Sequence, residues 1–299
     1  MIAHRKIALL GGDARQVTAA DRLLKSGYFV SFFAGACVEG LSLDSASSLE
    51  DSLSGTNAVL LPLPTSTDGV HLNAPFYEGK AIELLEVIKK MPPKALLIGG
   101  KIPEVMAKEA EKLGIQAVDY FGSEAFQIKN AYTTAEAAVY IAMNNMKKNL
   151  RGARFAITGY GRISRALTEL LLSFGARVRV LARKERDLAW ASLAGAEAVK
   201  LNESSIRELK NGYDIIFNTA PAYLFFEDFL REMDGETLIV DLASAPGGVD
   251  VSAAKRCGAK VLWAASLPGK YAPISAGELI ADCVCDICDL NTVESEVKE

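Results

Sequence analysis

The sequence predicts an α/β protein of two doubly wound, Rossmann-like domains with parallel sheets. Short apolar runs alternate with longer segments of helical apolar periodicity along the whole chain. Several of these runs end directly in glycine or in a polar, proline-containing loop, as strands do at the carboxyl edge of a parallel sheet. The length of 299 residues allows two domains of ordinary size.

The composition excludes several classes of protein. The content of 50% hydrophobic and 23% charged residues is typical of a globular protein with a large core. The net charge is −4 and no Lys/Arg stripe interleaves with aromatic residues, which argues against nucleic-acid binding. No apolar run approaches about 18 residues, so we expect no membrane span. The apolar stretch near the N-terminus is too short for a signal peptide and runs straight into an expected strand, so we expect a cytoplasmic protein.

The cysteine pattern favours reduced thiols. The number of cysteines is odd, and no export signal accompanies them. The cluster CVCDIC at 283–288 has no histidine and no second cysteine pair with zinc-finger spacing. It lies in a segment with helical apolar periodicity, where thiols act as small hydrophobic groups. We therefore predict no metal site. The cysteines are Cys37, Cys257, Cys283, Cys285 and Cys288.

The first domain, 1–130, opens with the apolar run KIALL at 6–10, which ends in GGDARQ. This turn lacks Gly-x-Gly spacing, so it does not predict a dinucleotide site. The helix expected from Ala14 to Lys25 still favours an anion at its N-terminus, such as a substrate carboxylate. Arg15 can hold a carboxylate through two hydrogen bonds, with Gln16 beside it. Asp13 either takes part in this site or only caps the helix.

A second strand of this domain, NAVLL at 57–61, runs into the loop PLPTSTDG. Ligands bind at this edge of open α/β sheets, so Thr65 and Ser66 are candidate hydrogen-bond donors to the substrate. His71 follows in a loop, where a lone histidine is more typical of an exposed residue than of a catalytic one. Helices over 80–90 and 103–113 and strands over 94–100 and 116–118 complete the domain.

A long helical segment at 131–150 links the two domains. Thr133 and Glu136 have the spacing of a capping box, with Thr134 as the alternative cap. The segment contains neither Pro nor Gly, and we expect a rigid connector.

The second domain, 151–274, begins with RFAITGYGRIS at 154–164. An apolar strand, a Gly-x-Gly turn and an apolar-periodic helix are the context that a dinucleotide fingerprint requires. Gly159 allows the tight turn, and Gly161 lets a pyrophosphate approach the backbone at the positive end of the helix. Ser164 replaces the third glycine. A plain βα turn is the alternative. The cofactor-binding residues predicted from the turn are Gly159, Tyr160, Gly161, Arg162 and Ile163.

The next strand, RVRVLARK at 177–184, predicts the choice of cofactor. An acidic side chain at this strand end binds the ribose 2′-hydroxyl of NAD. Here Ala182 is followed by two cations, Arg183 and Lys184, which suit a 2′-phosphate. We therefore predict NADP(H), unless these cations only solvate the surface.

Three further strand ends supply the remaining candidates: NTAP after 213–217, DLAS within 237–244, and SLPGKYAP after KVLWA. A polar strand end followed by proline commonly lies beside the nicotinamide ribose. A final helix at 275–290 is expected to pack back on the first domain, and the polar tail 291–299 is expected to be frayed. The cofactor candidates here are Asn218, Thr219, Pro221, Ser244, Leu267 and Pro268, and the catalytic candidates are Asp241 and Lys270.

Taken together, GGDARQ, GYGRIS, NTAP, DLASAPGGVD and LPGKYAPISAG resemble the A subunit of bacterial dipicolinate synthase, in order from about residue 6 to residue 285. DLAS-x-PGG-x-D followed by LPG-x-x-AP-x-x-AG is the specific part of this resemblance. Ser164 departs from the fingerprint. The region from Pro64 to Lys101 matches poorly, so the resemblance does not support His71.

The resemblance implies a two-domain architecture similar to that of 2-hydroxy-acid and alanine dehydrogenases. It implies NADP-dependent conversion of dihydrodipicolinate, or of hydrated 4-hydroxy-tetrahydrodipicolinate, into dipicolinate in the mother cell of a sporulating bacterium. It also implies a partner, the flavoprotein-like B subunit of the enzyme. We expect a homo-oligomer as well.

Under this hypothesis Arg15 binds one substrate carboxylate, helped by Gln16, Thr65 and Ser66, and Lys270 neutralises the other. Asp241 is the candidate base, or else it holds a loop through backbone N–H groups. Two alternatives stay open. One is an NADP-dependent dehydrogenase of another 2-oxo, 2-hydroxy or amino acid, and the other is a non-catalytic nucleotide-binding subunit.

Overall fold

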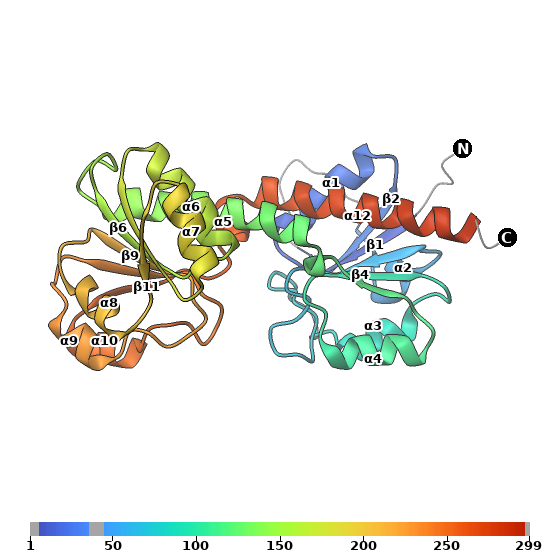
Figure 1. Cartoon of the computed structure of the whole chain (residues 1–299). Coiled ribbons are helices and arrows are strands. Elements are labelled where there is room, and N and C mark those ends of the chain that lie inside the picture. The colour runs from blue at the N-terminus through green and yellow to red at the C-terminus, as the bar shows by residue number, and fades with distance from the viewer. Residues whose placement is uncertain (1–5, 36–44, 297–299) are drawn as a thin grey trace. The chain divides into compact units, whose positions relative to one another are not determined.

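The computed structural model describes residues 6–35 and 45–296. The chain forms two compact units. Unit 1 contains the chain up to Lys129 together with the segment from Ala272 onward, and unit 2 runs from Asn130 to Tyr271. In each unit a parallel sheet is covered by helices on both faces (Figure 1).

The sheet of unit 1 has the strand order β2-β1-β3-β4-β5, and all its pairs are parallel. The order reverses between β1 and β3, so the loops that follow these two strands diverge and leave a crevice at the carboxyl edge. The strands are β1 (Lys6–Leu10), β2 (Phe29–Phe33), β3 (Ala58–Leu60), β4 (Leu96–Gly99) and β5 (Ala117–Asp119). The helices are α1 (Ala14–Lys25), α2 (Leu49–Leu53), α3 (Leu84–Lys90), α4 (Glu104–Lys112) and α12 (Pro273–Glu296), with the 3₁₀ turn η1 at Tyr120–Gly122.

The two faces of this sheet follow the alternation of side chains along each strand. In β1, Ile7 and Leu9 pack with α1 and α12, whereas Ala8 and Leu10 pack with α2, α3 and α4. Helix α12 lies along α1 at very short range. A Cβ atom added at Gly277 would lie 2.5 Å from the Arg15 carbonyl oxygen, so only glycine allows this approach.

Helix α5 (Glu124–Asn145) connects the units and begins well before the predicted linker. The predicted capping box at Thr133 and Glu136 is wrong, because both residues lie inside the helix. Thr134 is also internal, and its hydroxyl donates to the Asn130 carbonyl oxygen one turn earlier. The helix begins after Ser123, whose hydroxyl accepts a hydrogen bond from the Phe126 N–H at 3.3 Å and so caps its first turn. Phe126 is also buried against Tyr120, with ring centroids 5.1 Å apart.

The sheet of unit 2 has the order β11-β10-β9-β6-β7-β8, which is the dinucleotide-binding order with the switch point between β6 and β9. The strands are β6 (Arg154–Thr158), β7 (Arg177–Ala182), β8 (Glu197–Lys200), β9 (Ile215–Asn218), β10 (Leu238–Asp241) and β11 (Lys260–Trp263). The helices are α6 (Arg162–Ser173), α7 (Glu185–Leu193), α8 (Glu203–Arg207), α9 (Glu227–Glu232), α10 (Val251–Cys257) and α11 (Leu267–Tyr271), with the 3₁₀ turn η2 at Glu208–Lys210.

Side chains of β6 divide the core of unit 2 in the same way. Phe155 and Ile157 pack with α5, α6, α7 and α11, and Ala156 packs with α8, α9 and α10. Burying each large apolar side chain contributes about 1.5–3 kcal/mol, so both helical layers are held to the sheet mainly by apolar contacts. Along the described part of the chain, no helix is long and apolar enough to cross a membrane.

Candidate functional site

The glycine turn of unit 2 has the geometry that a phosphate group requires. Gly159 has a φ of +93°, and a Cβ atom there would lie 2.7 Å from Thr219 Oγ1. At Gly161 a Cβ atom would meet nothing within 4 Å, so the space over the turn is open. Gly161 precedes α6, whose first turn has no side-chain cap. The backbone N–H groups at this helix start therefore suit the pyrophosphate of a nicotinamide cofactor.

Ser164, at the third fingerprint position, is fully buried and ties α6 to the end of β9. Its hydroxyl lies 2.5 Å from that of Thr219, which in turn donates to the Thr158 carbonyl oxygen at 2.9 Å. A glycine at this position would allow close packing but could not form this link. The departure from the fingerprint therefore keeps the close approach and adds a hydrogen bond.

A buried chain of hydrogen bonds joins the ends of three adjacent strands, β6, β9 and β10. Thr158 Oγ1 donates to Asn218 Oδ1 at 2.6 Å, and Asn218 Nδ2 donates to Asp241 Oδ1 at 2.8 Å. The Asp241 carboxylate also accepts from the N–H groups of Ala243 at 3.1 Å and Gly248 at 2.7 Å. These hydrogen bonds give the side-chain oxygen and nitrogen atoms of Thr158, Asn218 and Asp241 partners, which a buried polar network needs in order to be stable.

This geometry bears on the role of Asp241, which is only 3% exposed. Its two oxygens already accept three hydrogen bonds, as expected of a carboxylate that holds a loop through backbone N–H groups. The position therefore favours loop-holding, one of the two roles left open by the sequence, over that of a base. Ser244, in the loop that follows, is exposed.

Arg183 and Lys184 follow the buried Ala182 at the end of β7, and both are exposed. Within the described ranges, no carboxylate lies within ion-pair distance of either cation. The neighbouring Arg186 differs, because its guanidinium lies 3.6 Å from Asp187. Two unpaired cations at this strand end suit a 2′-phosphate.

Other predicted cofactor residues contribute backbone or core packing. Tyr160 is buried under the guanidinium of Arg165, 5.4 Å from its ring centroid, and burial raises the pKa of its hydroxyl. Leu267 is 2% exposed in the core of unit 2, and Pro268 is buried beside it. Both were predicted to line the cofactor, but the segment after β11 folds into α11 and turns them inward. Ile163 packs against the same core, whereas the side chains of Arg162, Pro221 and Lys270 are exposed.

In unit 1, Arg15 and Asp13 lie at the carboxyl ends of β1 and β3, next to the switch point. Asp13 caps α1 and pairs with Arg15, whose Nη2 lies 2.8 Å from Asp13 Oδ2 and donates to the Leu63 carbonyl oxygen at 2.6 Å. Gln16 is 1% exposed and donates to the Leu60 carbonyl oxygen at 3.2 Å. These bonds fix the Arg15 guanidinium and partly neutralise it. The buried Gln16 amide is used in binding the carbonyl group at the end of β3.

The predicted hydroxyl donors of this unit already have acceptors within it. Thr65 is fully buried, and its hydroxyl donates to the Pro62 carbonyl oxygen at 3.3 Å. The Ser66 hydroxyl donates to Asp68 at 3.0 Å. In this arrangement neither proton is directed to a ligand. Asp68 also accepts from the N–H and ring of His71, which lowers the pKa of the carboxyl. His71 is partly buried, and its backbone forms an isolated antiparallel bridge with Glu83.

The sequence analysis did not single out two aromatic residues, one near the carboxyl edge of each sheet. Tyr120 is buried, and its hydroxyl has no hydrogen-bond partner among the described residues, so burial raises its pKa. Trp263, on the edge strand β11, donates its indole N–H to the Ala243 carbonyl oxygen at 3.3 Å. Neither residue belongs to a motif, because their neighbours are distant in sequence. In the described residues there is no group of His, Cys, Asp or Glu placed to hold a metal ion.

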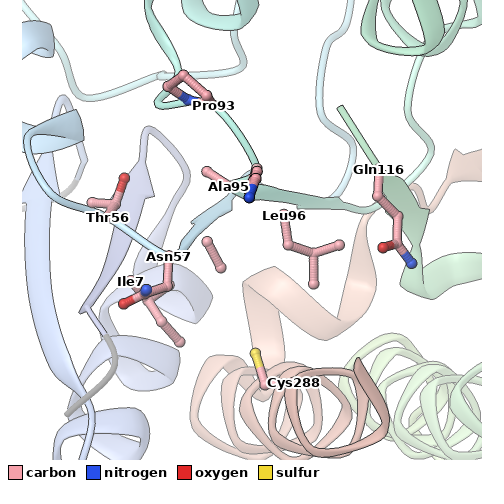
Figure 2. Close-up of a pocket in the computed structure, with 10 residues that line it drawn as sticks. Ile7, Thr56, Asn57, Pro93, Ala95, Leu96, Gln116 and Cys288 are labelled. Atoms are coloured by element: carbon pink, nitrogen blue, oxygen red, sulfur yellow. The ribbon is translucent and has the colours of Figure 1, made fainter. Parts of the chain in front are cut away.

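A pocket of about 430 Å³ lies at the opposite edge of the unit 1 sheet, where the strands begin (Figure 2). Asn57 and Leu96 line it from the start of β3 and β4, and Cys288 points towards it from α12. It contains none of the predicted site residues. The thiols of Cys283 and Cys285 pack on the same core, and burial raises the pKa of both.

Two family models match overlapping parts of the chain. Residues 6–121 match the N-terminal domain of the dipicolinate synthase A subunit, and residues 106–246 match the NAD binding domain of D-isomer specific 2-hydroxyacid dehydrogenases. The dipicolinate synthase A subunit of Bacillus subtilis (strain 168) is 27% identical over 291 residues, covering 94% of this chain and 95% of the relative.

Solved structures agree with these matches. The crystal structure of the dipicolinate synthase A subunit from Bacillus halodurans superposes with a TM-score of 0.83 at 26% identity, covering 96% of this chain and 98% of the other. The corresponding crystal structure from Bacillus subtilis gives a TM-score of 0.83 at 25% identity, covering 98% and 99%.

Proposed function

Because this chain belongs to the family of dipicolinate synthase A subunits, we propose that it oxidises dihydrodipicolinate, or 4-hydroxy-tetrahydrodipicolinate, to dipicolinate with NADP⁺. Dihydrodipicolinate loses a hydride and a proton, and the hydrated form also loses water. A bound nicotinamide cofactor supplies the hydride acceptor. Aromatisation of the ring provides the driving force, so the protein has mainly to bind and orient the substrate.

The open glycine turn at Gly159 and Gly161 carries this proposal. A helix start without a side-chain cap, at the switch point of a sheet in dinucleotide-binding order, is the arrangement that binds a pyrophosphate. The preference for NADP⁺ rests on Arg183 and Lys184, which have no carboxylate partner in the described residues. An anionic side chain at this place would repel a 2′-phosphate, whereas Arg183 attracts it.

For the two substrate carboxylates we propose Arg15 and Lys270 as the cationic contacts. The substrate carries two carboxylates, and each cation neutralises one of them. Arg15 is held rigidly by Asp13 and by the Leu63 carbonyl oxygen, so little conformational freedom is lost when it binds an anion. Lys270 is exposed on α11.

The relatives from Bacillus subtilis and Bacillus halodurans described above are A subunits, and we propose that this chain likewise works with a B subunit. The proposal includes the cytoplasm of a sporulating mother cell as its place of action and a homo-oligomeric state.

One experiment tests the function. The purified chain is mixed with NADP⁺ and 4-hydroxy-tetrahydrodipicolinate, which also yields dihydrodipicolinate in solution, with and without the B subunit. Dipicolinate and NADPH formed in equal amounts support the proposal. In parallel mixtures another 2-hydroxy or amino acid replaces this substrate, and NADPH formed only in those mixtures would assign the chain to a different dehydrogenase. NADP⁺ binding without turnover in every mixture would contradict the proposal, because the chain would then only bind the nucleotide.

A further inference from the structure

We propose that Asn218 and Asp241 are positioning residues that hold the loop from Leu242 to Gly248 against the nicotinamide end of the cofactor. This inference rests on the proposed nucleotide site. It replaces the role of Asp241 as a base with a role that acts through the loop.

The strand order places the two halves of a dinucleotide on opposite sides of the switch point. The glycine turn after β6 and the cations after β7 lie on the side where the adenosine half binds. The nicotinamide half then lies over the ends of β9 and β10, the strands that carry Asn218 and Asp241. The loop Leu242–Gly248 follows β10 directly and therefore faces this half.

The loop is closed at its base by a single carboxylate. Asp241 accepts from Ala243 N near the beginning of the loop and from Gly248 N at its end. Inside the loop, Gly247 N donates to the Ser244 carbonyl oxygen at 2.9 Å and forms a turn. The tip, residues 244–246, is exposed, whereas both ends are buried. A short loop fixed in this way presents a preformed surface to a ligand.

The backbone at Gly247 and Gly248 lies so close to Asn218 and Asp241 that there is no space for a larger side chain. A Cβ atom at Gly248 would lie 2.3 Å from Asn218 Nδ2, and one at Gly247 would lie 2.7 Å from Asp241 Oδ2. The indole N–H of Trp263 adds a third support through the Ala243 carbonyl oxygen. Asn218 orients Asp241, Asp241 orients the loop, and Trp263 fixes the loop from the neighbouring strand.

Three variants test this role. Asp241→Asn puts an amide donor opposite another N–H donor, either that of Gly248 or that of Asn218 Nδ2, so the loop should loosen. The double variant Asn218→Asp with Asp241→Asn restores a donor and an acceptor between the two side chains, and should recover part of the loss. Trp263→Phe removes only the indole hydrogen bond of a half-exposed side chain, so it should fold normally.

The readout compares NADP⁺ with adenosine 2′,5′-bisphosphate, a fragment that lacks the nicotinamide half. For Asp241→Asn we expect NADP⁺ affinity to fall about 10-fold or more and kcat about 100-fold, because displaced reacting groups cost roughly that much. Fragment affinity should stay within about 2-fold, since the glycine turn is intact. Trp263→Phe should show the same selectivity with a smaller loss.

A fluorescence measurement gives a second readout. The sequence contains two tryptophans, Trp190 and Trp263, and Trp190 lies half-exposed on α7. In a Trp190→Phe background, Trp263 is the sole reporter beside the loop. We expect NADP⁺ to change its emission and the fragment to leave it unchanged.

Several outcomes overturn the inference. If Asp241→Asn weakens NADP⁺ and the fragment equally, the network serves folding only. If it leaves NADP⁺ affinity unchanged and instead removes the acidic limb of the pH–rate profile, Asp241 acts as the base. Wild-type protein that binds neither NADP⁺ nor the fragment refutes the proposed function together with this inference. Wild-type protein that binds both, with unchanged variants, refutes this inference alone.

Discussion

The hydroxyl oxygens of Ser164 and Thr219 lie 2.5 Å apart, which joins the first turn of α6 to the end of β9 beside the proposed pyrophosphate site. The Thr219 hydroxyl in turn donates a hydrogen bond to the Thr158 carbonyl oxygen. One pair of side chains thus takes the place of the third fingerprint glycine and links the two strands on either side of the switch point.

We expect the two partners to respond unequally to removal. In Ser164→Ala, Thr219 keeps its bond to Thr158, and unfolding should become easier by about 1 kcal/mol. In Thr219→Val, the buried Ser164 hydroxyl loses its acceptor, and the cost should be about 1–3 kcal/mol. Urea unfolding of both variants and of the double variant gives the coupling energy. A coupling near zero would contradict a direct hydrogen bond.

Replacing Arg183 should separate the two cofactors. Arg183→Ala removes a charged hydrogen-bond donor, and a bond of this kind contributes about 1.5–3 kcal/mol. We expect NADP⁺ to bind roughly 10- to 100-fold more weakly and NAD⁺ to change by less than about 3-fold. Isothermal titration calorimetry measures both constants. Arg186→Ala is the matched control, because that cation is already paired with Asp187. Equal losses for both cofactors would assign Arg183 to a general surface charge.

Arg15→Ala should impair substrate use without affecting the nucleotide. We expect kcat/KM for the dicarboxylate to fall at least about 10-fold, since a charged hydrogen-bond donor is lost. The dissociation constant of NADP⁺ should not change, because the glycine turn belongs to the other unit.

Arg22→Ala provides the control for the Arg15 variant. Arg22 lies on the same helix, and its side chain is half-exposed and paired with Asp282. If kcat/KM of Arg15→Ala stays within a few-fold of wild type, Arg15 only supports the helix cap and the Leu63 carbonyl.

The contact between α1 and α12 depends on Gly277. A Cβ atom there would lie 2.5 Å from both the Arg15 carbonyl oxygen and Thr18 Cβ, so Gly277→Ala forces the helices apart. We expect a loss of about 1–3 kcal/mol and a lower Tm. At Gly122 a Cβ atom would meet nothing within 4 Å, so Gly122→Ala should leave Tm nearly unchanged. Calorimetry of both variants checks this. An unaltered Gly277→Ala protein would refute the close packing.

The thiols of α12 should resist alkylation at moderately alkaline pH. Burial raises the pKa of Cys283 and Cys285 above the usual 9.0, so the folded protein holds less thiolate than the unfolded chain. The corresponding contribution to stability is present at neutral pH and is lost as the pH rises above about 9. Mass spectrometry after iodoacetamide treatment measures the rates. The urea-unfolded chain is the control, and equal rates would contradict burial.

The local pattern of apolar and turn residues was sufficient to predict the fold class and the glycine turn. Apolar runs at 6–10, 57–61 and 154–158 correspond to β1, β3 and β6, because alternation and turn residues depend on near neighbours. The start of α5 was misplaced because Ser123 was not recognised as its cap, although its hydroxyl accepts from the Phe126 N–H. The packing of Phe126 on Tyr120 also holds the first turns, and helical periodicity does not encode that contact.

The sequence by itself determined that a nucleotide-type turn follows β6 and that two cations follow β7. Only the tertiary structure decided what surrounds them. Thr158 and Asn218 are 60 residues apart in the chain, and Asn218 and Asp241 are 23 apart, yet they form one buried network. The same folding turned Leu267 into the core and gave the Thr65 hydroxyl a backbone acceptor. Hydrogen-bond partners depend on which strands become neighbours, and strand order is set by the packing of the whole sheet.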